Sequence, residues 1–115
     1  MIRGVDLGGS GVEVRPGPGR TVLYFLTSSC ESCERVWEQL GAGMPGVAVT
    51  PDPATENRRR LRRLAAPGTT VVMSTGAWLE YVSGPAPWRV VIEDGEVVSA
   101  DTWPFGPRPG PTPGG

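Results

Sequence analysis

Cys30 and Cys33 stand between a β-favouring run and an amphipathic pattern, and this segment constrains the fold more than any other part of the chain. Residues 21–26 form a nearly continuous run of β-branched and large apolar side chains, which is typical of a central strand covered on both faces. Apolar side chains then recur at three- and four-residue steps, at Cys33, Val36, Trp37 and Leu40. The spacing predicts a helix over about residues 30–40, which Gly41 ends.

The rest of the chain alternates strand-like and helix-like segments. In chain order we predict a hairpin over 4–14, a strand over 47–49, a helix that begins at Asp52 and ends before Pro67, a strand over 69–73, a short helix over 77–82, and a hairpin with strands at 88–92 and 96–99. Strands that alternate with helices favour a parallel pair, and the last hairpin adds antiparallel strands. The expected fold class is therefore α/β with a mixed sheet.

The length and the distribution of glycine and proline indicate one domain with a tail. A chain of 115 residues is enough for one modest core. Nine of the last twelve residues are glycine or proline, and such a segment can bury little apolar area. We predict a domain over residues 1–103 and a disordered Pro/Gly-rich tail over residues 104–115.

The composition excludes several classes of function. There is no histidine and no lysine, which removes the usual Ser-His and Cys-His catalysis, histidine-ligated metals and the P-loop lysine. A net charge of −1 argues against a nucleic-acid partner. No apolar run approaches the roughly 18 residues of a membrane span, and the N-terminus has no apolar signal region, so a cytoplasmic location is expected.

The two cysteines are placed for redox chemistry. One helical turn separates their Cα atoms by about 5 Å, inside the range that a disulfide accepts. Cys30 falls at the helix N-terminus, where free N–H groups stabilise a thiolate, and Cys33 turns inward. Zinc would need four ligands, and these are the only two cysteines. Two inert cysteines, or a metal shared between subunits, are the alternatives.

Three segments, TVLYFLTSSCESC, ERVWEQL and GPAPWRVVIEDGEVVSA, resemble the thioredoxin-like disulfide oxidoreductases, closest to the reductase group that includes TlpA-type proteins. The resemblance implies a thioredoxin-like three-layer sandwich and catalysis by Cys30 and Cys33. It also implies a cis-proline loop that faces the cysteines. Here Ala86-Pro87 stands in that place, and Ala86, Pro87 and Trp88 are the expected substrate-binding residues.

The same resemblance implies the partners of the reaction and marks where this chain departs from the family. The expected partners are a protein or small-molecule disulfide and an external thiol donor, with no cofactor. The family usually has tryptophan before the first cysteine, where this chain has Ser29, and thioredoxins carry a buried acid where it has Tyr24. The terminal helix of the family is not visible after Ala100, so we expect it to be reduced or missing.

Several interpretations stay open at the level of sequence. The cysteine pair could reduce substrate disulfides, oxidise substrate thiols, or only bridge a metal or partner in a non-catalytic thioredoxin-like binding module. The arginine-rich run over residues 58–63 is interpreted as a solvated helix face, ahead of a docking patch for an acidic partner or a nucleic-acid site. Trp37 is predicted to be core, whereas Trp88 could line the substrate groove or pack internally.

Overall fold

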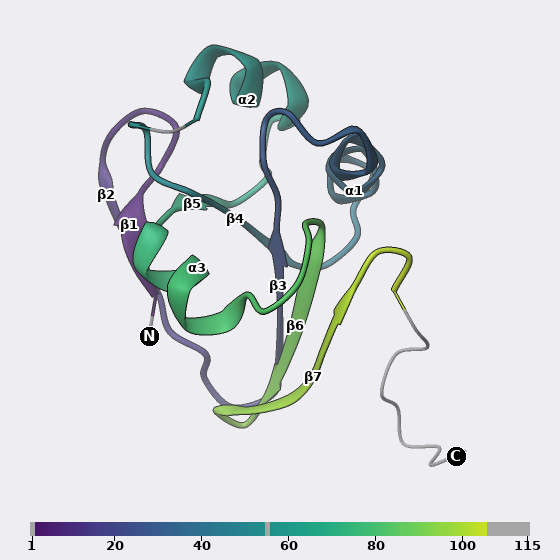
Figure 1. Cartoon of the computed structure of the whole chain (residues 1–115). Helices are drawn as coiled ribbons and strands as arrows, with labels where there is room; N and C mark the ends of the chain where they lie inside the picture. The colour runs from purple at the N-terminus through teal and green to yellow at the C-terminus, as the bar shows by residue number, and fades with distance from the viewer. Residues whose placement is uncertain (1, 55, 106–115) are drawn as a thin grey trace.

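The computed structural model describes residues 2–54 and 56–105, which form one seven-stranded sheet and three helices (Figure 1). The strands are β1 (Ile2–Val5), β2 (Gly11–Val14), β3 (Arg20–Phe25), β4 (Val47–Thr50), β5 (Val71–Met73), β6 (Trp88–Glu93) and β7 (Glu96–Thr102). The helices are α1 (Glu31–Gly41), α2 (Arg58–Leu64) and α3 (Thr75–Tyr81).

The sheet is mixed, in the order β2-β1-β5-β4-β3-β6-β7. Strand β3 pairs parallel with β4, which pairs parallel with β5, and β3 pairs antiparallel with β6 on its other side. The two predicted hairpins are β1–β2 and β6–β7, at opposite edges of the sheet (Figure 1). This arrangement confirms the α/β class with a mixed sheet.

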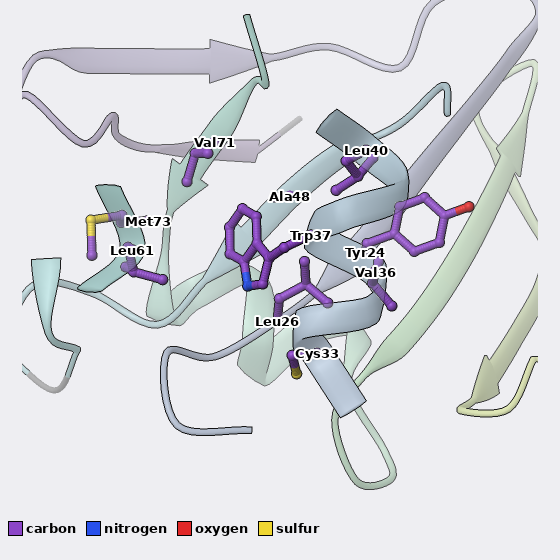
Figure 2. Packing of buried hydrophobic residues seen from close by; sticks show 10 residues of the cluster. All are labelled: Tyr24, Leu26, Cys33, Val36, Trp37, Leu40, Ala48, Leu61, Val71 and Met73. Carbon is purple, nitrogen blue, oxygen red and sulfur yellow. The ribbon is translucent and has the colours of Figure 1, made fainter. Parts of the chain in front are cut away.

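The core has two layers because side chains of a strand point alternately to its two faces. Tyr24 of β3 and Leu26 just after it face the cluster that α1 and α2 cover, whereas Leu23 and Phe25 of β3 face the cluster that contains Ala77 of α3. Figure 2 shows the first of these clusters, in which the Trp37 ring of α1 extends toward Leu61 of α2. The buried α1 residues are those of the predicted stripe, Cys33, Val36, Trp37 and Leu40. The predicted core role of Trp37 is confirmed, since its side chain is 1% exposed.

The predicted start of the second helix at Asp52 is wrong. The Asp52 carboxylate accepts hydrogen bonds from Ala54 N at 3.0 Å and from Thr75 Oγ1 at 2.7 Å. The side chain therefore closes a local turn and ties it to α3, and an aspartate can do this as readily as it can cap a helix. The cap lies five residues later than predicted, at Asn57, whose side chain accepts from Arg60 N at 3.0 Å, and helix α2 begins at Arg58.

Across the described residues, which end at Phe105, no helix follows β7. Instead the Phe105 ring lies 5.7 Å from the Tyr24 ring and 4.8 Å below the Arg89 guanidinium, and the Trp103 ring meets it edge-on at 5.5 Å. These two aromatic side chains cover part of the sheet beside α1. The rest of the predicted tail, residues 106–115, lies outside the described residues.

A cavity of about 330 Å³ remains on the same face of the sheet, beyond Tyr24. Its lining residues are Arg20, Thr21, Val22, Tyr24, Pro45, Gly46, Val47, Arg89 and Val91. The cavity and the Phe105 ring thus share Tyr24 and Arg89 as neighbours, so one short aromatic segment covers only part of the surface between α1 and β6.

Replacing Leu61 with alanine is expected to destabilise the chain by about 2–5 kcal/mol, because Leu61 is 0% exposed and is the buried residue of α2. Leu79→Ala is the matched control, since the same deletion on α3 concerns a side chain that is 82% exposed and should change stability by less than about 0.5 kcal/mol. Urea unfolding of both variants measures the difference. Equal losses of stability would contradict this packing of α2.

Candidate active site

The two cysteines lie where β3 gives way to α1, and their surroundings differ sharply. Cys30 is the N-cap of α1, and its Sγ accepts a hydrogen bond from Cys33 N at 3.2 Å. Both thiols are free, with Cys30 half-buried and Cys33 completely buried. The helix N-terminus therefore directs a backbone donor at the accessible sulfur, an arrangement that stabilises negative charge there.

Burial controls the ionisation of the second thiol. It is the largest of the causes that raise the pKa of Cys33 from 9.0 to about 12, and the hydrogen bond with the neighbouring Cys30 and the charge of that residue add to it. Two hydrogen bonds from Thr27, one from its backbone and one from its side chain, act in the opposite direction. Cys33 is therefore a protonated thiol at neutral pH while the pair is reduced.

The loop before β6 faces the cysteines. The Ala86–Pro87 peptide bond is cis, and the Cys30 thiol points at Ala86 O over 3.8 Å. The end of β7 holds this loop, because Thr102 Oγ1 donates to Pro85 O at 2.8 Å and Trp103 N donates to Pro87 O at 3.0 Å. The structure thus brings Cys30, Cys33 and Ala86 together from two distant parts of the sequence.

Trp88, the third residue expected to bind substrate, has a different environment. Its side chain belongs to the cluster on the α3 face, and its Nε1 donates to Tyr81 O at 3.0 Å. The ring also lies against Gly84, where an added Cβ would come within 2.6 Å of Trp88 Cζ3. Of the two roles that the sequence left open for Trp88, the geometry favours packing over groove lining.

Tyr24 and Ser29 stand where the resemblance implied a buried acid and a tryptophan, and neither side chain takes over the role of the group that it replaces. The Tyr24 hydroxyl donates to Met44 Sδ at 3.5 Å, and Ser29 is exposed. Among residues 2–54 and 56–105, no group of three or more acidic, cysteine or histidine side chains is placed to hold a metal ion. What this arrangement can support chemically is thiol–disulfide exchange at two neighbouring sulfurs.

A second set of contacts, which sequence analysis missed, surrounds Ser28. Ser28 N donates to Glu56 Oε1 at 2.7 Å, and Asn57 N donates to Ser28 Oγ at 3.4 Å. Arg60 Nε donates to Ser28 O, and Arg60 Nη2 donates to Glu34 Oε2 at 3.1 Å. The only signal in the sequence was the arginine-rich run itself, which we interpreted as a solvated face.

Comparisons with known proteins place the fold. No protein-family model matches the chain, and no curated protein matches it. Several solved structures, however, are similar to the chain. A thioredoxin-like protein from Aeropyrum pernix is 16% identical, with a TM-score of 0.65 over 90% of this chain and 82% of that one. A secreted disulfide oxidoreductase from Mycobacterium tuberculosis is 15% identical, with a TM-score of 0.63 over 84% and 80%.

A third similar structure is a copper-bound ScoI from Arabidopsis thaliana, which is 12% identical, with a TM-score of 0.55 over 90% of this chain and 87% of that one. Together these likenesses show that the chain has a thioredoxin-like fold, as the resemblance in its sequence implied. No helix among the described residues has the length and apolar character needed to cross a bilayer. Since one similar protein is secreted, the fold itself does not support the expected cytoplasmic location.

The raised pKa of Cys33 predicts how the stability of the reduced protein depends on pH. Because the folded state holds this proton up to about pH 12 and the unfolded thiol releases it near 9.0, stability should fall as the pH rises through that window. Urea unfolding with a reductant present should show that the advantage of the wild type over Cys33→Ser shrinks above pH 9. A constant difference between the two up to pH 11 would contradict the raised pKa.

Proposed function

We propose that the protein is a thiol–disulfide oxidoreductase that uses Cys30 and Cys33 as its redox pair. The observation that carries this proposal is the asymmetry of the two sulfurs. Cys30 is accessible and accepts the backbone N–H of Cys33, whereas Cys33 is buried and its pKa is raised to about 12. Cys30 can thus attack a substrate disulfide, and Cys33, one helical turn away, can attack the mixed disulfide that results.

In the first step, the Cys30 thiolate attacks one sulfur of a substrate disulfide. A bond forms between Cys30 Sγ and that sulfur, and the other substrate sulfur leaves as a thiolate that takes up a proton. Cys33 does not compete for the substrate, because it is protonated and completely buried. The product is a mixed disulfide between Cys30 and the substrate.

In the second step, Cys33 attacks Cys30 Sγ and releases the second substrate thiol. Cys30 carries no charge once it is in the mixed disulfide, so its charge no longer raises the pKa of Cys33, while the two hydrogen bonds from Thr27 still lower it. Formation of the mixed disulfide therefore eases deprotonation of Cys33. The departing substrate thiolate takes up a proton, and the net result is one oxidised pair and two reduced substrate thiols.

An external thiol donor would then reduce the Cys30–Cys33 disulfide, and the reverse sequence would oxidise substrate thiols. We favour the reducing direction because Glu31 follows Cys30 directly and its negative charge opposes the thiolate. A less stabilised thiolate favours the disulfide form of the pair, so the dithiol gives up its electrons more readily.

The Ala86–Pro87 loop is the proposed substrate-binding segment. Ala86 O already faces Cys30, and Pro87 has no N–H to donate. An extended stretch of substrate could therefore align its backbone with Ala86, as in strand addition, and present its disulfide to Cys30. The end of β7 fixes the loop through Thr102 and Trp103, which keeps that surface in place before substrate arrives.

Replacing Cys33 with serine should trap the protein as a mixed disulfide with substrate, because the second attack is lost and the first remains. Cys30→Ser should trap none. Incubation with an oxidised peptide, followed by mass measurement without reductant, detects the adduct. If Cys33→Ser gives no adduct, or Cys30→Ser gives as much, the assigned roles are wrong.

The wild type should lose two hydrogens on oxidation and regain them with a mild reductant, which thiol alkylation and mass measurement detect. This experiment separates the proposal from the alternative, a non-catalytic module whose cysteines bridge a metal or a partner. A protein that keeps both thiols alkylatable after exposure to oxidised glutathione would favour that alternative.

Replacing Glu31 with glutamine should raise the reduction potential of the pair by about 5–20 mV, because removing the charge stabilises the Cys30 thiolate. Glu38→Gln removes the same charge from an exposed position nearly two turns further along α1 and serves as the control. Equilibration with glutathione redox buffers measures both potentials. A potential that falls in Glu31→Gln would contradict the proposed direction.

A further inference from the structure

Ser28 is a buried polar residue whose hydrogen-bonding groups are all bound by one short stretch of chain. It is 6% exposed and lies two residues before Cys30. Its N–H donates to Glu56, its hydroxyl oxygen accepts from Asn57 N, and its carbonyl accepts from Arg60 Nε. Glu56, Asn57 and Arg60, which we call the Ser28 clamp, belong to the start of α2 and the residues just before it.

Arg60 extends these contacts into the redox helix. While Nε holds the Ser28 carbonyl, Nη2 donates to Glu34 Oε2 at 3.1 Å, and Glu34 lies in the first turn of α1. The Arg60 guanidinium thus joins the loop before Cys30 to helix α1, which follows Cys30. A planar group with several fixed donors can make both bonds at once, which an ammonium group cannot do with the same geometry.

This connection bears on Cys30 because Cys30 is the N-cap between the two attached points. The hydrogen bond from Cys33 N to Cys30 Sγ exists only while the loop enters α1 along its present path. If the Ser28 carbonyl were released, Cys30 could leave the cap position, and its thiolate would lose a backbone donor. The fixed loop therefore stabilises the thiolate over the neutral thiol and the disulfide.

We propose that Arg60 and Glu56 are positioning residues of the redox pair, which hold Cys30 at the N-cap of α1 by binding the backbone of Ser28. The equilibrium between dithiol and disulfide then depends on a helix that contributes no group to the chemistry. This inference rests on the proposed function for its biological meaning, although its effect on the Cys30 thiolate can be measured in the reduced protein alone.

The charges of the Ser28 clamp and of the first turn of α1 set the expected direction. Glu31 and Glu34 of α1 and Glu56 before α2 oppose a thiolate, Arg60 favours it, and the Ala86 loop contributes a carbonyl rather than a charge. Losing Arg60 removes both the favourable charge and the attachment, so both effects disfavour the thiolate. Glu56→Gln keeps an oxygen for Ser28 N and removes an unfavourable charge, so it should act in the opposite direction.

The test compares Arg60→Met with Arg63→Met, which removes the same charge from an exposed position on the same helix. In Arg60→Met, alkylation of Cys30 by iodoacetamide at pH 7 should slow by about two- to fivefold, the size of one helix-terminus interaction. The equilibrium with glutathione should shift toward the disulfide by a similar factor. Arg63→Met should leave both quantities within experimental error of the wild type.

If Arg60 has a purely structural role, Arg60→Met should lower the unfolding midpoint but leave the alkylation rate and the glutathione equilibrium at the values of Arg63→Met. That result would overturn the proposal. If Arg60→Met does not fold, Arg60→Lys decides the question, because it keeps the charge and loses the planar group that makes both bonds. Alkylation of Cys30 should be slower in Arg60→Lys than in Arg63→Met, and equal rates would overturn the proposal. If the wild type forms no disulfide, the proposed function fails, whereas the alkylation rates still test the clamp.

Discussion

The hydrogen bond from Cys33 N to Cys30 Sγ is the contact on which the rest of the site depends. This hydrogen bond requires Cys30 to cap α1. Cys30 can do so beside the Ala86 loop because β3 ends on the side of the sheet where that loop also lies. Because β3 is paired on both sides, with β4 and with β6, this end of the strand is held firmly. The central strand therefore fixes where the accessible sulfur can lie.

The sequence predicted the parts of the fold whose residues carry their own local signal. The run over residues 21–26, the stripe from Cys33 to Leu40 and the strand pair at 88–92 and 96–99 each specify one element, and each is found. Asp52 was misread because its carboxylate serves a turn in this fold, and the same side chain suits either use. The Ser28 clamp was invisible because its partners are 28–32 residues away in sequence.

Among the described residues, Cys33 has no buried acid beside it to accept its proton, unlike the second cysteine of thioredoxins. Tyr24 stands at that position and turns its hydroxyl to Met44, so Thr27 is left as the group that lowers the pKa of Cys33. A threonine can stabilise a thiolate by hydrogen bonding but is a poor proton acceptor. In the proposed reaction, the proton of Cys33 is then removed most readily when Cys30 has lost its charge, so attack by Cys33 would follow formation of the mixed disulfide.

The absence of a helix after β7, within the described residues, has a consequence for the Ala86–Pro87 loop as well as for the core. The chain continues from β7 directly across the loop, so Thr102 and Trp103 bind the Pro85 and Pro87 carbonyls, while Phe105 packs on Tyr24. The segment that covers part of the sheet is thus the same segment that holds the proposed substrate surface. Cys30 lies between two attachments of this kind, the end of β7 on the loop side and the start of α2 on the Ser28 side, and neither contributes a reacting atom.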